Sequence, residues 1–491
     1  MAERHKKGYI NFLMLLRVIG WLLNIEAVFM FAPCILGFVD GEHSGINFLI
    51  CIGITAGCGI CMVSLKPKSR DMGKREAIIL TGLTWVVLSA FGMLPFLFCG
   101  THLSVTDAFF ETMSGFTTTG ASVLDTLHNV PDSILLWRCI EQWIGGLGII
   151  LFTLAVLPML NYQGGMQLFN AEVTGITHDK LRPRVSFTAQ SLWGVYLVLT
   201  IICIILLSVS ELSFFEAVCY GLSTMSTGGF ATQDTSISEL GNLYIKSILI
   251  IFMFMGGVNF SLLYKLVTGK FKEFFRNEVI RWYIILILVF ALILALNVLV
   301  TGLMENWEDV TIDPLFQTVS LFSSTGLVEP DFYDWGALPV VLLIIMMVFG
   351  ACAGSTSGGA KIDRFVILFK FVRNEFHKLM HPNAITTVTL NGKGTPPPIL
   401  MKTLAFLFLY VTVIILGGIF FVLVGLPLKD SFFITLSAVS NTGLGTDITG
   451  FNGNFAQIPD VAKWFMSFLM LVGRLELFTI LILFFPSFWR K

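Results

Sequence analysis

Charged residues are scarce in this sequence of 491 residues: Asp, Glu, Lys and Arg make up 13% of it, hydrophobic residues make up 55%, and the mean hydropathy is +0.82. A soluble domain of this size carries many more charges on its surface. The net charge is only −1, so the overall charge indicates no particular partner. The composition excludes a soluble protein and predicts an integral membrane protein.

Cysteine and histidine form no recognisable framework. Nine cysteines are scattered through apolar runs and seven histidines lie singly. Cys58 and Cys61 have C-x-x-C spacing, but no second pair accompanies them, so we interpret them as small buried hydrophobic residues. No Rossmann fingerprint, Walker motif or catalytic cluster occurs. We therefore expect no enzyme activity, no organic cofactor and no nucleic acid as a partner.

The apolar runs are long enough to cross a bilayer, which takes about 20 helical residues. We predict ten spans, at 10–37, 47–65, 79–99, 134–160, 191–209, 244–267, 281–301, 337–372 (interrupted), 399–425 and 462–485. Lysine and arginine gather after the second, fourth, sixth and eighth spans and at the C-terminus, whereas the alternate loops are acidic. By the positive-inside rule, both termini of this multi-pass protein are cytoplasmic.

A short segment containing a Thr-Gly dipeptide occurs four times, at intervals of about a hundred residues. The dipeptides are Thr119-Gly120, Thr227-Gly228, Thr325-Gly326 and Thr442-Gly443. Three copies share an acid, a phenylalanine and a serine at matching distances before the glycine: Asp107, Asp313 and Asp430; Phe110, Phe316 and Phe433; Ser114, Ser320 and Ser437. The second copy, counted from Phe215, is about one helical turn longer and matches less well.

Each copy is typical of a re-entrant half-helix that ends in a glycine turn. Glycine adopts positive φ and lets its backbone approach a ligand closely. Irregular backbone at membrane depth is tolerated only where it lines a cavity or is buried in protein. Four such turns around one axis would offer carbonyl oxygens that replace the hydration shell of a monovalent cation.

We therefore predict an all-α membrane protein with one central pore per chain. Its parts are a two-helix N-terminal preface at 1–75 and four pseudo-fourfold repeats of helix, pore half-helix with filter loop, and helix, at 76–180, 181–275, 276–392 and 393–491. The loops at 161–190 and 373–398 are the longest on the predicted cytoplasmic side, and neither can hold a nucleotide-binding domain of about 100 residues. Control by a nucleotide would have to come from another chain.

The sequence resembles the TrkH-like members of the Trk/Ktr/HKT superfamily of potassium transporters over nearly its whole length. The segments that carry the resemblance are F-T-T-T-G-A at 116–121, S-T-M-S-T-G-G-F-A-T-Q-D at 223–234, S-S-T-G-L-V at 323–328, S-N-T-G-L-G at 440–445, Q-W-I-G-G-L-G at 142–148, G-A-C-A-G-S-T-S-G-G-A-K at 350–361 and G-R-L-E-L at 473–477. The resemblance implies potassium uptake across the bacterial inner membrane by a gated, channel-like subunit. It also implies a homodimer and a cytosolic, TrkA-like nucleotide-binding partner.

The resemblance places a filter that binds the transported K+ at the four turns. Its residues would be Thr118, Thr119 and Gly120; Ser226, Thr227 and Gly228; Ser324, Thr325 and Gly326; and Asn441, Thr442 and Gly443. In this superfamily a serine in place of the first-repeat glycine marks sodium-permeable members, so Gly120 favours potassium. Two alternatives stay open, a sodium-permeable relative and a symporter coupled to H+ or Na+. Symporters, however, usually show inverted halves and intramembrane carboxylate relays.

The resemblance also implies a gate beneath the filter. Its residues would be Gly350, Ala351, Cys352, Ala353, Gly354, Ser355, Thr356, Ser357, Gly358, Gly359, Lys361 and Arg474. The small residues from Gly350 to Ala360 cannot hold a firm helix, although small residues also serve close helix packing. Arg474 lies mid-span, where a charge costs at least about 2.5 kcal/mol, so we expect a functional role for it, and the resemblance implies that it faces the pore. The alternative is a structural ion pair with Glu141 or Glu476.

Other charged and polar residues receive weaker interpretations. Four acids follow the turns and would either concentrate cations at the outer mouth or be ordinary solvated acids: Asp125, Asp234, Glu329 and Asp447. Five residues lie at buried depth, where we expect packing or anchoring for most of them: Arg17, Glu26, Arg138, Glu141 and Asn259.

Overall fold

The structure is a computed structural model, and it describes residues 10–41, 43–67, 72–124, 126–148, 185–233, 242–302, 306–328, 332, 335–446, 448–449 and 454–490. These residues are mostly helical. A single short hairpin, β1 (Thr389–Leu390) paired with β2 (Lys393–Gly394), is the β-sheet found in the described ranges. The predicted all-α membrane fold is confirmed.

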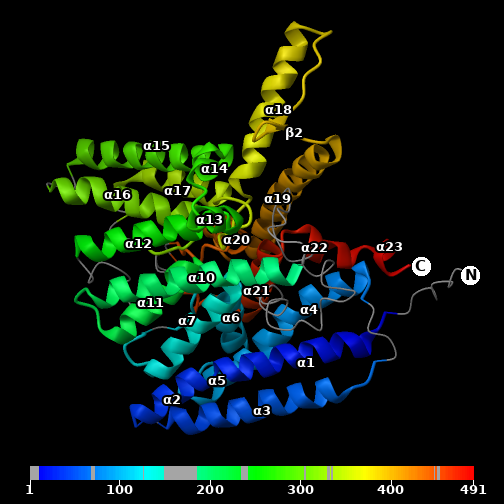
Figure 1. Cartoon of the computed structure of the whole chain (residues 1–491). Coiled ribbons are helices and arrows are strands. Elements are labelled where there is room, and N and C mark those ends of the chain that lie inside the picture. Colours follow the sequence, from blue (N-terminus) through cyan, green and yellow to red (C-terminus); the bar gives the residue numbers. More distant parts are fainter. Residues whose placement is uncertain are drawn as a thin grey trace, which may run out of the picture.

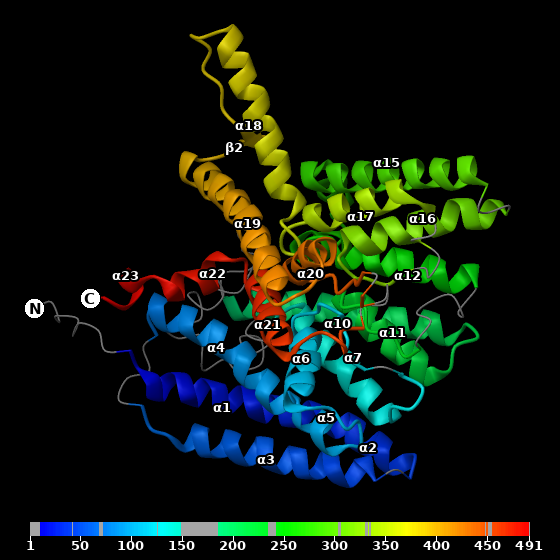
Figure 2. The same ribbon diagram turned by 180° about the vertical axis from the view of Figure 1, so that it is seen from behind.

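The N-terminal helices α1 (Phe12–Phe29), α2 (Phe31–Val39) and α3 (Ser44–Ser64) lie along one side of the molecule (Figures 1 and 2). α1 and α3 run side by side and approach closely at two glycines. A Cβ on Gly20 would lie 2.7 Å from the carbonyl oxygen of Gly59. Small residues allow this because van der Waals packing between backbones is a main attraction between helices in lipid.

The rest of the described chain alternates long helices with shorter ones. Their bounds are α4 (Lys74–Gly92), α5 (Leu94–Phe98), α6 (Val105–Phe116), α7 (Asp132–Gly146), α10 (Val185–Ser208), α11 (Phe214–Ser226), α12 (Leu243–Gly256), α13 (Phe260–Val267), α14 (Phe271–Arg276), α15 (Glu278–Thr301), α16 (Trp307–Phe322), α17 (Ala337–Phe349), α18 (Ile362–Met380), α19 (Pro397–Leu423), α20 (Leu428–Ser440), α21 (Asp460–Arg474), α22 (Phe478–Leu481), η4 (Ile482–Phe484) and α23 (Pro486–Trp489). The C-terminal halves of α6, α11, α16 and α20 are buried. These four helices are the half-helices that precede the predicted turns.

Six helical stretches in the described residues are long and apolar enough to cross a membrane: Phe12–Val39, Ser44–Ser64, Lys74–Phe98, Thr188–Ser208, Glu278–Thr301 and Pro397–Leu423. Two predicted spans are not straight. The span at 244–267 bends by 111° between α12 and α13, and the span at 462–485 bends by 113° between α21 and Phe478–Phe484. The expectation of uninterrupted helices was wrong there. The span at 134–160 is seen as α7, and residues 149–160 lie outside the described ranges.

The first bend has a clear physical cause. Backbone carbonyls and amides freed at the end of α12 bond to segment 350–361 instead of continuing the helix. Cys352 N–H donates to Gly257 O at 3.1 Å and Phe260 N–H donates to Gly354 O at 3.0 Å. The side chain of Asn259 donates to Ala353 O at 2.6 Å and accepts from Ser261 N–H at 2.8 Å, so it caps α13 while holding the segment.

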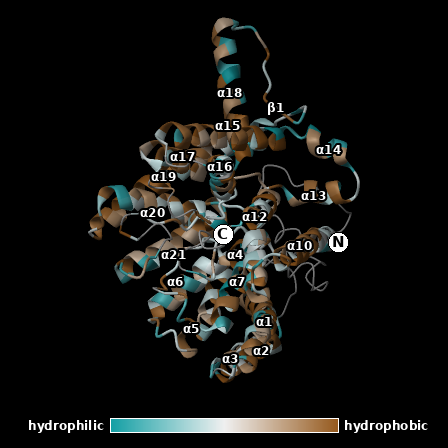
Figure 3. Ribbon diagram, turned by 90° about the vertical axis from the view of Figure 1, so that its left-hand side faces the viewer, coloured by the Kyte–Doolittle hydropathy of each residue, from teal (hydrophilic) through white to brown (hydrophobic). Residues whose placement is uncertain are grey.

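The outer faces of the long helices are apolar. Leu288 and Leu292 on α15 and Phe408 and Leu416 on α19 are at least 59% exposed, and Figure 3 shows apolar ribbon along both helices. Large exposed apolar surfaces of this kind are typical of contact with lipid. α18 and the β1–β2 hairpin project away from the bundle (Figures 1 and 2) and carry more polar residues.

Candidate functional site

Each of the four short buried helices is followed by the same backbone turn. A residue with left-handed backbone comes first, and a glycine with positive φ follows two positions later. The left-handed residues are Thr118 (φ 53°), Thr227 (55°), Ser324 (55°) and Asn441 (51°), and the glycines are Gly120 (83°), Gly229 (80°), Gly326 (77°) and Gly443 (73°). Residues other than glycine rarely adopt this conformation, so its fourfold occurrence marks a built feature. We call the segments 118–120, 227–229, 324–326 and 441–443 the corners.

A backbone hydrogen bond at the end of each helix fixes the register of the corners. In the first copy Thr119 N–H donates to Ser114 O at 2.9 Å. In the second copy Gly228 N–H donates to Ser223 O at 3.0 Å. The following residue, Gly229, therefore takes the place of the first-copy glycine. The alignment that gave this place to Gly228 was wrong.

Counted from Gly229, the second copy has the same length as the others. Glu216 then stands where Asp107 stands in the first copy, and Ser223 stands six residues before the glycine. The additional helical turn inferred from the sequence was also wrong. The alignment failed because the turn requires a glycine at positive φ and not the Thr-Gly dipeptide as such.

The four corners close into a ring. Each glycine lies so near a carbonyl oxygen of the next corner that an added Cβ would overlap it. In order around the ring, the pairs are Gly120 with Gly228 O, Gly229 with Thr325 O, Gly326 with Thr442 O and Gly443 with Thr119 O. These contacts return to their starting point, so the corners surround a common axis. One carbonyl oxygen from each corner belongs to this buried ring.

Hydroxyl pairs brace three of the corners. They join Thr117 with Thr119 (2.8 Å), Ser323 with Thr325 (2.7 Å) and Ser440 with Thr442 (2.9 Å). In the second corner the corresponding residues are Ser226 and Gly228, so the second hydroxyl is missing. The ring is therefore only pseudo-fourfold in its side chains.

Segment 350–361 separates α17 from α18, as the small residues predicted, and lies against two corners and against the end of α20, which precedes the fourth corner. Its contacts there are hydrogen bonds from Thr227 Oγ1 to Thr356 Oγ1 (3.2 Å), from Gly358 N–H to Ser324 Oγ (2.5 Å) and from Gly359 N–H to Ser440 O (3.0 Å). The ammonium of Lys361, which is buried, donates to Ser357 O. Ala351, Cys352 and Ala353 are buried close to the bend between α12 and α13. The structure thus places Thr356 and Gly358 of the sequence-predicted gate against the corners, and Ala351 to Gly354 against the bend between α12 and α13.

The guanidinium of Arg474, at the end of α21, joins the first corner to this segment. Its acceptors are Thr118 Oγ1 (3.0 Å), Thr356 O (2.5 Å), Gly145 O (2.7 Å) and Gly146 O. Arg474 was singled out from the sequence, but its acceptors on α7 were not. Glu476 is instead paired with Arg364, their Nη2 and Oε2 atoms being 2.5 Å apart.

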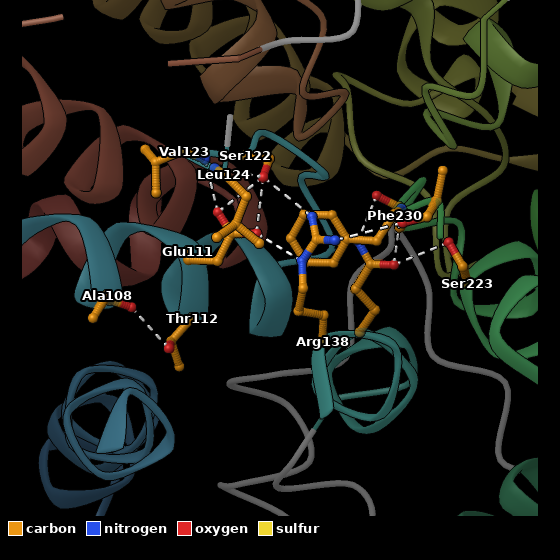
Figure 4. A network of polar contacts seen from close by, with 12 residues as sticks. Ala108, Glu111, Thr112, Ser122, Val123, Leu124, Arg138, Ser223 and Phe230 are labelled. Carbon is orange, nitrogen blue, oxygen red and sulfur yellow. Dashed lines mark hydrogen bonds and ion pairs between the residues drawn. The ribbon is translucent and has the colours of Figure 1, made fainter. Parts of the chain in front are cut away.

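Behind the first two corners lies a buried ion pair (Figure 4). Arg138 Nε and Glu111 Oε1 are 2.8 Å apart, and both side chains are at most 2% exposed. Glu111 also accepts from Ser122 Oγ at 3.0 Å and from Val123 N–H at 2.8 Å. The guanidinium of Arg138 lies 4.1 Å from the ring centroid of Phe230. The pair therefore connects the chain after the first corner with the chain after the second.

Two further ion pairs involve the acids that the repeats share. Lys463 Nζ is 2.5 Å from Asp107 Oδ1, and Lys246 Nζ is 2.7 Å from Asp313 Oδ1. The first joins α21 to α6 and the second joins α12 to α16. Sequence reasoning noticed these acids without giving them partners, and it missed Glu111. An acid inside the apolar half-helix F-E-T-M-S-G-F was the signal that could have found it.

The sequence also singles out six other acidic residues. Asp125, Asp234, Glu329 and Asp447 lie outside the described residues. Glu26 and Glu141 are buried, and their carboxylate oxygens have no hydrogen-bond partner within the part of the chain that the structure describes. Over the same residues, no group of three or more His, Cys, Asp and Glu side chains could hold a metal ion.

Comparison with known proteins gives consistent matches. The family profile described as TrkH, cation transport protein, matches residues 48–491. The chain is 34% identical over 487 residues to the Trk system potassium uptake protein TrkH of Salmonella typhimurium, covering 98% of this chain and 100% of that protein. It is 32% identical over 486 residues to the Trk system potassium uptake protein TrkG of Escherichia coli K12, covering 96% and 97%.

A solved structure has the same fold. The crystal structure of the potassium transporter TrkH from Vibrio parahaemolyticus matches with a TM-score of 0.88 and 31% sequence identity. The match covers 98% of this chain and 100% of that one. The similarity therefore extends over the preface, the four corners and the segment beside them.

Proposed function

We propose that this chain, which belongs to the TrkH family of cation transport proteins, takes up potassium across a membrane by passing the ion through the ring of corners. The curated relatives are named potassium uptake proteins, so the chain is a transporter and not an enzyme. K+ is the cargo, and the corners are the part of the chain that would select it.

One observation carries the proposal: the closed ring in which each corner glycine meets a carbonyl oxygen of the next corner. Main-chain oxygens in a ring can replace the water around a dehydrated alkali cation. With the register of the structure, the proposed filter consists of residues 118–120, 227–229, 324–326 and 441–443, so that Gly229 joins Thr227 and Gly228 in the second corner. Ser226 then belongs to the end of α11.

The proposed gate is segment 350–361 together with Arg474. Hydrogen bonds hold the segment against the corners, and the guanidinium of Arg474 donates to both the segment and Thr118. A fixed positive charge beside the path raises the barrier for a cation. Because the segment is not part of a continuous helix, it can be displaced without unwinding α17 or α18. Displacement of the segment, with release of Arg474, would open the path.

Flux measurements on purified protein in liposomes test the filter. We expect potassium to permeate in preference to sodium, and Gly120→Ser to lower this preference roughly tenfold, which corresponds to about 1.4 kcal/mol. The reason is that a side chain on Gly120 would overlap Gly228 O and force the ring apart. Equal permeability of the two ions in the unchanged protein, or an unchanged preference in the variant, would contradict the proposal.

A second candidate is symport of potassium with H+, favoured by the two buried carboxylates of Glu26 and Glu141. Neither has a hydrogen-bond partner among the described residues, and intramembrane carboxylates commonly serve as proton relays. Single-channel recording distinguishes the candidates. A unitary conductance that Glu141→Gln leaves intact supports the channel, whereas potassium flux that follows an imposed pH gradient and is lost in Glu141→Gln supports the symporter.

We further propose that the protein is a homodimer in the bacterial inner membrane, with both termini cytoplasmic and a cytosolic TrkA-like nucleotide-binding partner. The projecting helix α18 supports the dimer, because Phe369, Val372 and Phe376 form an exposed apolar stripe at helical spacing that a second copy would cover. Oxidative cross-linking of Phe376→Cys should give a dimer in membranes. Cross-linking no greater than for a cysteine at lipid-facing Leu288 would argue against it.

A further inference from the structure

Gln142 begins the segment Q-W-I-G-G-L-G on α7, and neither the filter nor the gate gives it a role. Its side chain is fully buried. The amide nitrogen Nε2 donates to Gly228 O at 2.7 Å, while Oε1 accepts from Ser223 Oγ at 3.0 Å and from Phe230 N–H at 3.2 Å. One side-chain amide from the first repeat therefore bonds to the second copy at three points, which are Ser223 before the corner, Gly228 within it and Phe230 after it.

The second corner differs from the others at the position that Gln142 reaches. The other three corners carry Thr119, Thr325 and Thr442 there, each braced by a neighbouring hydroxyl. The second corner carries Gly228, and a Cβ on it would lie 2.5 Å from Oε1 and 2.7 Å from Nε2 of Gln142. The side chain of Gln142 thus fills the space that a threonine would occupy.

We propose that Gln142 is a positioning residue that fixes the Gly228 carbonyl in the ring and thereby contributes to the selection of potassium over sodium. The proposal rests on the proposed function of the corners. Gly228 O is the atom that meets Gly120 in the ring, so its position sets the distance between the first two corners. A carbonyl oxygen has two lone pairs, and the bond from Gln142 leaves one available for an ion.

Loss of the amide would release this oxygen. A ring in which one carbonyl moves freely can close around a smaller cation, so sodium gains relative to potassium. Removing a buried hydrogen bond typically costs enough free energy to change an equilibrium about tenfold. Gln142 should therefore affect the ratio of the two ions and not only the amount of folded protein.

The test uses the full chain in liposomes, with potassium and sodium permeability measured by reversal potential. We expect Gln142→Leu to lower the preference for potassium roughly tenfold. Asn297→Leu is the matched control, because Asn297 Nδ2 also donates to a backbone carbonyl, that of Trp335, at 2.9 Å, but outside the corners. The control should leave the preference unchanged.

A rescue experiment covers the case in which Gln142→Leu fails to fold. Gly228→Ser alone should lower the preference for potassium, since the introduced side chain collides with Gln142. In the double variant Gly228→Ser with Gln142→Ala, the introduced hydroxyl has space, because the Gln142 side chain is shortened. It also has a hydroxyl partner in Ser226, which occupies the position of Thr117 in the first copy. The double variant should recover potassium preference relative to either single variant, a non-additive result.

The outcomes separate this proposal from the one on which it rests. If Gln142→Leu keeps its selectivity while Gly120→Ser loses it, the corners remain the filter and Gln142 has no part in it. If both variants keep their selectivity, the filter itself lies elsewhere. If the double variant is no better than the single ones, the pairing of Gln142 with Gly228 does not set the geometry of the corner, and the proposal fails.

Discussion

Arg364 and Glu476 form an ion pair, with 2.5 Å between Nη2 and Oε2, that joins the start of α18 to the bend after α21. Arg364 stands in the first turn of α18, directly after segment 350–361, and its Nη1 donates to Ala360 O at 2.8 Å. Glu476 stands two residues beyond Arg474, in the bend of 113°, where it and Leu477 have left-handed backbone. Movement of α18 would therefore pull on the bend that carries Arg474.

We expect Glu476→Gln to weaken this connection and raise potassium flux severalfold. The substitution keeps the size of the side chain but removes its charge, and Glu476 is 21% exposed, so the pair is only partly screened by solvent. Initial rates of potassium uptake into liposomes measure the effect. Lys378→Gln, which removes an exposed ion pair with Glu375 on the same helix α18, should leave the rate unchanged. A lower rate in Glu476→Gln would contradict the connection.

Arg474→Ala should raise the transport rate or change KM for potassium while the protein still folds. The variant removes the positive charge beside the corners and the hydrogen bonds to Thr118 and Thr356. Rates as a function of potassium concentration, together with elution as a single species in size-exclusion chromatography, check both parts. Arg474→Lys keeps the positive charge but loses the forked geometry of the guanidinium. Its transport rate should therefore lie between that of the unchanged protein and that of Arg474→Ala. Failure of Arg474→Ala to assemble would favour a structural role.

Arg138→Met should destabilise the protein by about 3–5 kcal/mol, because it leaves the Glu111 carboxylate buried without its partner. Thermal unfolding in detergent measures the loss. Adding Glu111→Gln to the same protein should restore part of the stability, since no uncompensated charge then remains. Lys270→Met is the control, because its pair with Glu273 is solvent-exposed and contributes about 1 kcal/mol or less. Equal effects of Arg138→Met and the control would show that the buried pair is not a structural tie.

Lys463→Met and Lys246→Met should each lower the unfolding temperature, since each removes one side of an ion pair that joins two neighbouring helices, α21 to α6 and α12 to α16. The loss should be larger for Lys463, which is 4% exposed, than for Lys246, which is 12% exposed. Raising the salt concentration should reduce the loss of unfolding temperature only a little in either variant, because these partly buried pairs are screened less than exposed ones. A strong salt dependence would place these lysines in solvent.

Local patterns account for much of the fold. Hydropathy located the spans, and the run of small residues located the interruption between α17 and α18. The bends at Gly257 and Glu476 were not predicted. The first depends on hydrogen bonds from segment 350–361, nearly a hundred residues away, and the second on two left-handed residues that are not glycine. Neither bend can be recognised from the hydropathy of the residues around it.

Much the same holds for the candidate site. The Thr-Gly repeats and Arg474 were visible because each departs from an apolar background. Glu111 and Gln142 were not recognised, because a single polar residue in a helix shows its role only through its partner. The partners of Gln142 are Ser223, Gly228 and Phe230, which lie in another repeat.

Read alone, the chain specifies a lipid-embedded protein with four turn segments, since hydrophobicity and the backbone freedom of glycine are properties of short stretches. Only the folded chain decides that Gly229 is the second corner glycine, that the corners meet in a ring, and that Gln142 stands in for a missing threonine. The ring and the place of Gln142 depend on contacts between residues that lie roughly a hundred or more positions apart, and such contacts arise from packing that no local pattern encodes.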